Sequence, residues 1–156
     1  VSSIIYLITI SFNSAYHPHL FKQLASGFKG KIHRTTLLYI CAIGIAVVLM
    51  FIGMPVLFKY FIGDRFHGAQ VYVYLLTSGY FMWGIYNAFL GYLLYLSKNR
   101  QIFFISITGM LVSILLNAFV VPRYGAMGAA VTSIFTYSAM ALICFLYVRK
   151  YFLYRQ

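Results

Sequence analysis

Residues 101–148 read QIFFISITGMLVSILLNAFVVPRYGAMGAAVTSIFTYSAMALICFLYV, and Arg123 is the one charged residue among them. The hydrocarbon core of a bilayer is about 30 Å thick, and a helix that rises about 1.5 Å per residue crosses it with about 20 apolar residues. The stretch holds two such lengths, one on each side of Pro122-Arg123-Tyr124-Gly125. Because proline ends a helix and glycine permits a tight reversal, we expect an antiparallel pair of membrane helices here.

Two further uncharged stretches, 35–58 and 69–97, are long enough to cross a bilayer, and the uncharged residues 1–16 are interpreted as a span cut short. The chain is 63% hydrophobic and 8% charged, whereas about 25% of an ordinary soluble domain is charged. In hydrocarbon every backbone NH and CO needs an internal partner, and no alternating strand pattern is present. The sequence therefore predicts an all-α fold, a polytopic transmembrane helix bundle with four full spans plus one truncated N-terminal span. The expected spans are about 1–16, 36–58, 70–97, 101–121 and 125–148.

The charges are unequally shared between the connecting segments. Twelve Lys and Arg face a single acid, Asp64, which gives a formal net charge of +11. Their confinement to connecting segments argues against nucleic acid as a partner. Nine cations lie in alternate segments, and the other three lie in the segments between them. The positive-inside rule then predicts a multi-pass membrane protein whose C-terminus is cytoplasmic. The nine occur in 17–34, 98–100 and 149–156, and the three in 59–68 and at 123.

The residues that metal sites and catalytic centres use are scarce. With no Glu and one Asp, the chain cannot build a carboxylate pair or an acidic magnesium cage, so we expect no enzyme, no catalytic residue and no cofactor. Cys41 and Cys144 lack metal-ligand spacing and are expected to pack among apolar side chains. His17 and His19 flank Pro18 without a third ligand beside them, so no metal site is predicted.

Segment 19–34 combines apolar residues near helical spacing with four cations. Such a basic amphipathic helix lies in the membrane interface, with its cations near anionic headgroups. It is either a solvated positive-inside anchor or a surface that attracts an anionic lipid substrate. The cations are Lys22, Lys29, Lys31 and Arg34.

Polar residues follow one face of several predicted spans. A polar group that faces lipid costs free energy, so these faces are expected to turn toward other helices or a hydrated interior. The alternative is close helix packing, in which small residues approach tightly and each Asn bonds a neighbour for about 0.6 kcal/mol. We expect the last span, with Gly125, Ala129 and Ser133, to pack in this way. The stripes contain Asn13 and His17 in the first segment, Tyr80, Gly84, Asn87 and Gly91 in 70–97, and Gly109, Ser113 and Asn117 in 101–121.

Several segments resemble the bacterial polysaccharide biosynthesis proteins, the O-antigen and capsule oligosaccharide flippases. Ala15-Tyr16-His17-Pro18-His19-Leu20-Phe21-Lys22 is similar to their Ala-aromatic-x-Pro-x-Leu-Phe signature. Residues 62–69, IGDRFHGA, resemble a Gly-acid-x-Phe-x-Gly segment, and Gly79-Tyr80 with Gly84, Ile85 and Tyr86 resembles the following helix. Residues 117–130, NAFVVPRYGAMGAA, are similar to the pattern of an Asn, then Pro-x-x-Gly, then Gly-Ala-Ala.

The resemblance implies a superfamily that also contains multidrug exporters, and residues 1–156 would match the C-terminal portion of the second of two lobes. The implied function of the intact protein is to move a polyprenyl-pyrophosphate-linked oligosaccharide across the bacterial inner membrane for O-antigen, lipopolysaccharide or capsule biosynthesis. Its implied partners are that lipid, membrane lipids, the remaining helices of the transporter and the polysaccharide polymerase machinery. The expected substrate path is lined by Asn13, Tyr80, Asn87 and Asn117, and the expected cationic cytoplasmic entrance is formed by Lys22, Lys29, Lys31 and Arg34.

Two other functions remain open at this stage. A multidrug-type ion antiporter is expected to carry intramembrane acids, and no predicted complete span contains one. A non-transporting helical module that packs within a membrane biosynthetic complex is expected to have dry, small-residue interfaces instead of a hydrated face.

Overall fold

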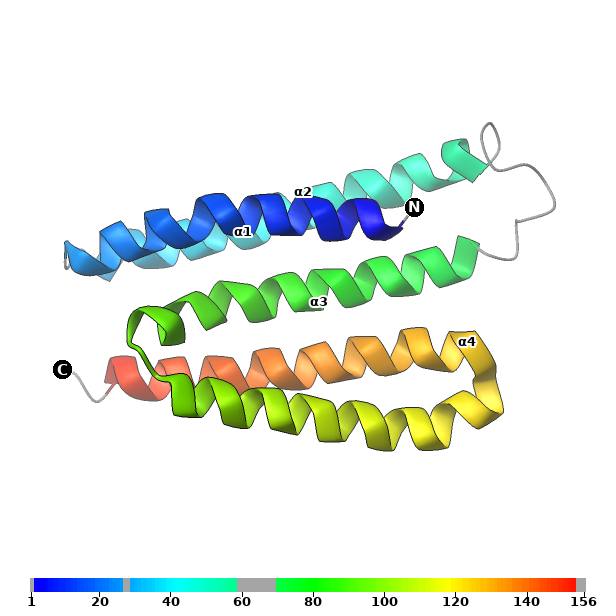
Figure 1. The fold of residues 1–156 in the computed structure, drawn as a ribbon. Helices are drawn as coiled ribbons and strands as arrows, with labels where there is room; N and C mark the ends of the chain where they lie inside the picture. The colour runs from blue at the N-terminus through cyan, green and yellow to red at the C-terminus, as the bar shows by residue number, and fades with distance from the viewer. Residues whose placement is uncertain (1, 27–28, 59–69, 154–156) are drawn as a thin grey trace.

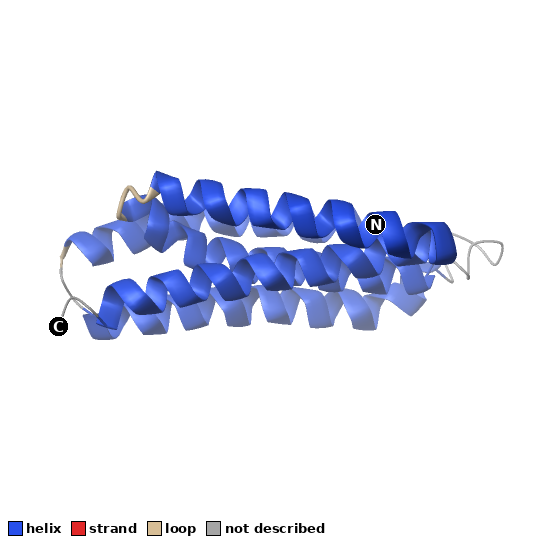
Figure 2. Cartoon of the chain, turned by 90° about the horizontal axis from the view of Figure 1, so that it is seen from below, coloured by secondary structure: helices blue, strands red, loops and turns tan. Residues whose placement is uncertain are grey.

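The computed structural model describes residues 2–26, 29–58 and 70–153, and it is built from helices (Figure 1). No strand occurs within these described ranges, as Figure 2 shows. The predicted all-α fold is therefore confirmed. The four elements are α1 (Ser2–Ala25), α2 (Lys29–Leu57), α3 (Gln70–Tyr95) and α4 (Asn99–Leu153).

Helix α4 reverses direction at Gly125, where φ is 56° and ψ is −137°. Glycine adopts this positive φ readily, whereas a Cβ makes it costly for other residues. Residues 99–124 form the first limb and residues 126–153 the second limb, which runs back beside it (Figure 1). The predicted reversal within Pro122–Gly125 is confirmed.

Close approach of the two limbs depends on small residues. A Cβ on Gly128 would lie 2.9 Å from the backbone oxygen of Val120, and a Cβ on Gly109 would collide with the Met140 thioether. Ala130 is buried as well. Close packing in this span therefore falls on Gly128 and Ala130, with Gly109 in the facing limb, whereas the packing role predicted for Gly125 is wrong, because Gly125 is exposed and nothing lies within 4 Å of the position of its Cβ.

Helices α1 and α3 run in the same direction, and α2 runs opposite to both. Ring contacts between α1 and α3 join Tyr6, near the N-terminus of α1, to Tyr80 in the first half of α3. Phe21 contacts Tyr95 near their C-termini. A Cβ on Gly84 of α3 would lie 3.1 Å from Ile43 Cδ1 of α2 and 3.4 Å from Thr9 Cγ2 of α1, so this glycine lets three helices converge.

The basic segment 19–34 is not a separate element but is divided between two helices. Residues 19–25 complete α1, a hydrogen bond from Ser26 N to Lys22 O closes its last turn, and α2 begins at Lys29. Leu20 is fully buried against α3 at Gly91, which has no side chain. A Cβ at Gly91 would lie 2.9 Å from Leu20 Cδ2, so the glycine leaves the room that Leu20 fills. Burial of this side chain holds residues 19–25 in the bundle, so α1 extends beyond the predicted end at residue 16.

Large apolar side chains cover the outside of α2 and α4. In the most apolar segment of α2 only 22% of the residues are buried within the bundle, and in that of α4 only 11% are. The core helix of a soluble protein, by contrast, is mostly buried. Among the described residues, two runs are apolar and long enough to cross a membrane, Arg34–Leu57 and Asn99–Lys150. Within the described ranges neither α1 nor α3 contains such a run, so fewer helices meet this criterion than the predicted spans require. The most exposed apolar side chains include Leu38, Ile45, Leu49 and Ile52 of α2 and Phe103, Leu115, Phe119 and Phe135 of α4.

Candidate functional site

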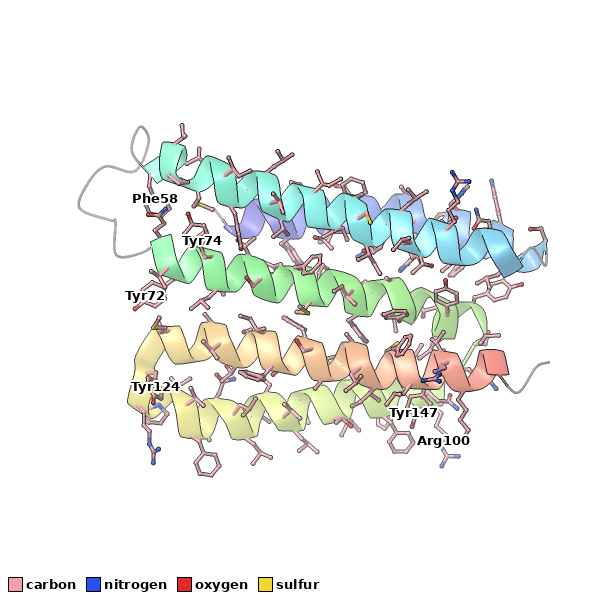
Figure 3. The ribbon with its side chains drawn as sticks, turned by 180° about the vertical axis from the view of Figure 1, so that it is seen from behind. Phe58, Tyr72, Tyr74, Arg100, Tyr124 and Tyr147 are labelled. Atoms are coloured by element: carbon pink, nitrogen blue, oxygen red, sulfur yellow. The ribbon has the colours of Figure 1, made fainter. Side chains whose placement is uncertain are left out.

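Positive charge gathers at one end of the bundle. The end of α1, the start of α2, the α3–α4 turn and the end of α4 meet there, opposite the reversal of α4 (Figure 1). Figure 3 places Arg100 and Tyr147 at this end and Tyr124 at the other. The described side chains of this cationic end are Lys22, Arg34, Lys98, Arg100, Arg149 and Lys150. All are exposed except Lys98, which is partly buried.

Of the predicted entrance residues, Lys22 and Arg34 lie at this cationic end with exposed side chains. Lys29 and Lys31 belong to the first turn of α2, but their side chains lie outside the described part of the chain. Arg123 lies beside the reversal at the opposite end, and the described ranges contain no acidic residue. Among the described side chains, the charge alternation in the sequence therefore becomes an axial separation of charge.

The α3–α4 turn is tight, which keeps its cations at the end of the bundle. Ser97 has a φ of 53°, and Lys98 N donates a hydrogen bond of 2.9 Å to Leu93 O. This pattern closes the C-terminus of α3 in the manner of a left-handed cap. One turn later the Arg100 guanidinium lies 5.7 Å from the centre of the Phe104 ring. Backbone geometry and a cation–π contact thus hold Lys98 and Arg100 where α4 begins.

A cluster of side-chain hydroxyls joins α1, α2 and α3 between the cationic end and the middle of the bundle. Tyr16 Oη of α1 lies 3.0 Å from Thr36 Oγ1 of α2 and donates a 3.2 Å hydrogen bond to Ala88 O of α3. Thr36 is also hydrogen-bonded to Tyr92 of α3. We call Tyr16, Thr36 and Tyr92 the hydroxyl cluster. All three are buried, so their mutual bonds remove the cost of leaving polar groups unpaired in an apolar setting.

Asn13, a predicted path residue, belongs to the edge of the hydroxyl cluster. Its side-chain oxygen accepts a hydrogen bond from Tyr39 of α2, and the Tyr39 ring stacks on that of Tyr16 with centroids 4.3 Å apart. Asn13 is half-buried. Sequence reasoning missed Thr36, Tyr39 and Tyr92, although hydroxyls that recur on an otherwise apolar helix are a usable signal. Their convergence from three helices, however, depends on the packing.

Asn87 lies one residue before Ala88, near the same cluster. Its amide nitrogen donates a 2.8 Å hydrogen bond to Trp83 O of its own helix, and the residue is 8% exposed. His17 faces the next turn of α3, where a Cβ on Gly91 would lie 3.3 Å from its Cδ2 atom. Its Nε2 atom is buried without a hydrogen-bond partner in the structure.

Asn117 and Tyr80 lie apart from Asn13 and Asn87. Asn117 donates 2.8 Å to Ser113 O and accepts 2.8 Å from Thr132 Oγ1, so its side chain links the two limbs of α4. Tyr80 is half-buried against Tyr6 in the first half of α3. The four predicted path residues therefore occupy three local environments: the surroundings of the hydroxyl cluster for Asn13 and Asn87, the ring contact with Tyr6 for Tyr80, and the interface between the limbs of α4 for Asn117.

The cysteines and histidines show no metal-binding arrangement within the described ranges, where no three His, Cys, Asp or Glu side chains gather. Cys144 is buried in the apolar core, as expected, whereas Cys41 is exposed on α2, so the packing prediction is wrong for Cys41. The His19 ring is hydrogen-bonded at 3.0 Å to Gln23, which accepts a 2.8 Å bond from Thr35 at the start of α2. These contacts tie the α1 and α2 ends together.

No family model, no curated protein and no solved structure matches this chain.

Proposed function

We propose that this chain is a multi-span part of a bacterial inner-membrane flippase that translocates polyprenyl-pyrophosphate-linked oligosaccharides for surface polysaccharide biosynthesis. The observation that carries the proposal is the combination of an apolar exterior with one cationic end. A protein that moves a polyprenyl lipid within the bilayer needs helices whose outer surface is apolar, like the hydrocarbon around them. The pyrophosphate of that lipid is anionic and needs cations beside the membrane surface.

The apolar exterior supports several membrane crossings. Contiguous apolar patches on a soluble monomer seldom exceed a few hundred Å², whereas the outer faces of α2 and both limbs of α4 are apolar over their length. The run Asn99–Lys150 contains the reversal at Gly125, so it supplies two limbs that are each long enough to cross. In the proposal α1 and α3 also cross, and their polar side chains face neighbouring helices.

The cationic end supports the identity of the headgroup. Lys22, Arg34 and Arg100 project from different helices at this end, and no described acid neutralises them. Lys and Arg near a membrane surface each attract anionic lipid by about 1 kcal/mol. A pyrophosphate placed here leaves its polyprenyl chain in lipid and its sugars free to enter the helix interfaces. The quoted motifs that resemble the oligosaccharide flippases favour the same substrate.

Cysteine labelling tests whether the predicted path is hydrated. In a background with Cys41 and Cys144 replaced by Ala, we expect Asn87→Cys to react with a membrane-impermeant maleimide in intact cells. Arg123→Cys, at the exposed reversal, is the reactive control. Leu115→Cys, on the apolar exterior, is the matched unreactive control. An Asn87→Cys variant as unreactive as Leu115→Cys would count against the hydrated path.

One observation favours a second function, that of a packing module in a membrane biosynthetic complex. The Asn117 side chain is hydrogen-bonded to Ser113 and Thr132, one on each limb of α4, as expected in a dry helix interface. Under this alternative Asn117→Cys and Asn87→Cys both stay unreactive, and loss of the chain impairs complex assembly instead of lipid translocation. The multidrug antiporter is less favoured, because the described helices offer no acid to bind a cation.

A further inference from the structure

Four aromatic side chains from three helices gather toward the cation-poor half of the bundle. The Tyr6 ring of α1 lies 5.6 Å from the Tyr80 ring and 5.3 Å from the Trp83 ring of α3, tilted against them by 47° and 34°. Tyr137, on the second limb of α4, lies within electrostatic range of Tyr80 and Tyr6. We call Tyr6, Tyr80, Trp83 and Tyr137 the aromatic cluster. Tyr6 remains 40% exposed and the others are partly buried, so ring surface is left uncovered.

The hydroxyls of the aromatic cluster differ from those near the cationic end. Tyr16, Tyr39 and Tyr92 each form a hydrogen bond to another helix. Among the described side chains, no such bond joins the hydroxyls of Tyr6, Tyr80 and Tyr137. A partly buried hydroxyl in an apolar setting gains free energy from a partner. The aromatic cluster therefore combines apolar ring faces with several unused hydrogen-bonding groups.

The charge around the aromatic cluster selects the kind of ligand. Aromatic groups also bind cations, but no described acid lies near these rings and the whole chain carries a net charge of +11. A cation held among these rings would have no described carboxylate to pair with. An uncharged ligand with an apolar face and hydroxyls around its rim satisfies both the rings and the phenols. A sugar ring has this chemistry.

We infer that the aromatic cluster is a saccharide-binding subsite that stacks an uncharged sugar ring of the transported headgroup. The inference rests on the proposed function and adds where the sugar is held. Tyr6 and Lys22 are separated along α1 by roughly 24 Å at about 1.5 Å per residue. A headgroup whose pyrophosphate stays at the cationic end reaches the aromatic cluster only if it carries several sugar residues, so the subsite favours an oligosaccharide over a single sugar.

The fluorescence of Trp83 offers a direct measurement, because it is the single tryptophan of the 156-residue chain. The chain is reconstituted in phospholipid nanodiscs and titrated with a polyprenyl pyrophosphate that carries an N-acetylglucosamine trisaccharide. The same lipid without sugar is the reference probe. We expect a saturable change in Trp83 emission with the trisaccharide lipid and a smaller, unsaturable change with the bare lipid. Equal responses to both lipids would overturn the inference.

Conservative variants separate binding from folding. Tyr6→Phe and Tyr137→Phe keep the ring and remove one hydroxyl, and each is expected to weaken binding about three- to tenfold, the equivalent of one hydrogen bond. Tyr124→Phe, at the reversal of α4, is the matched control; Tyr124 is 66% exposed and is not part of the aromatic cluster, so the variant should bind like the parent chain. Unchanged affinity in both cluster variants, with circular dichroism like that of the parent, overturns the assignment.

Two further arms distinguish the alternatives. The first arm is a titration with tetramethylammonium. If this cation changes Trp83 emission at a lower concentration than the trisaccharide lipid does, the aromatic cluster is a cation site and the inference is overturned. In a liposome translocation assay, a chain that binds the trisaccharide at Trp83 but does not move the lipid would contradict the proposed function alone. A chain that moves the lipid without any response of Trp83 to sugar would contradict the subsite alone.

Discussion

Thr132 donates a hydrogen bond of 2.8 Å to the side-chain oxygen of Asn117, from the opposite limb of α4. The two residues lie roughly two turns from the reversal at Gly125, one on each side of it. Thr132 is 1% exposed, and Asn117 also donates to Ser113 O within its own limb. The bond therefore fixes the register of the two limbs close to the point where they separate.

Removing this bond should loosen the pairing of the two limbs. We expect Asn117→Leu and Thr132→Val each to lower the free energy of unfolding, with a coupling between them of about 0.6 kcal/mol and at most about 1.7 kcal/mol, the range for hydrogen bonds between membrane helices. The measurement is a double-mutant cycle from reversible unfolding in mixed detergent micelles. Thr108→Val, whose hydroxyl donates only to Phe104 O in its own limb, is the control. Additive effects of the two main substitutions would mean that the bond contributes nothing.

The reversal itself should depend on the missing Cβ of Gly125. Nothing lies within 4 Å of the position where a Cβ would stand, so Gly125→Ala adds no collision but must adopt a φ near 56°. We expect a loss of about 1 to 2 kcal/mol in unfolding free energy. Gly53→Ala is the matched control, because Gly53 is helical and also has open space. It should be neutral or stabilising by up to about 1 kcal/mol. Equal responses of both glycines would contradict the strained reversal.

The sequence predicted those features that depend on composition and on local chain geometry. Absence of charge over about 20 residues forces helices in a bilayer, and Pro122 followed by Gly125 forces a reversal, so α4 could be anticipated before its structure. The axial separation of charge was also predicted, because alternating connections of antiparallel helices must lie at opposite ends. These are properties that each segment carries by itself.

Features that depend on which faces meet were not predicted. Segment 19–34 has an amphipathic pattern, but Leu20 finds a site opposite Gly91, and this tertiary contact draws residues 19–25 into α1. Asn13 and Asn117 were assigned to one path because both are polar. In the fold they have different partners: Asn13 is hydrogen-bonded to Tyr39 of α2, and Asn117 to Thr132 of the other limb of α4. Helical spacing shows that a side chain lies on a polar face but not which neighbouring helix covers that face.

The hydroxyl cluster should contribute to stability through hydrogen bonds more than through packing. Tyr16→Phe keeps the stacking on Tyr39 and removes the bonds to Thr36 and to Ala88 O. We expect a loss of about 1 to 2 kcal/mol, in line with one or two buried hydrogen bonds. Unfolding in mixed micelles followed by circular dichroism gives the value.

The control for Tyr16→Phe is Tyr147→Phe, a half-buried tyrosine near the cationic end (Figure 3) and outside the hydroxyl cluster. It should change stability by less than about 0.5 kcal/mol. If Tyr16→Phe and Tyr147→Phe both unfold with the free energy of the parent chain, the hydrogen bonds of the hydroxyl cluster contribute no net stability. The junction of α1, α2 and α3 then depends on ring packing alone.

The separation of charge along the bundle leads to an expectation about orientation. Nine of the twelve cations belong to segments at the cationic end, so a reporter fused after Gln156 should be active as a cytoplasmic fluorescent protein and inactive as a periplasmic phosphatase. Changing Lys98, Arg100, Arg149 and Lys150 to Gln leaves five cations in the segments 17–34, 98–100 and 149–156 against three in the alternate segments of the sequence. With the bias reduced to this extent, we expect a mixed population in which both reporters are active. Replacing the neutral neighbours Asn99 and Gln101 by Ala should leave the orientation unchanged. A phosphatase that is active on the parent chain would place the cationic end outside the cell, where it could not receive a cytoplasmic pyrophosphate.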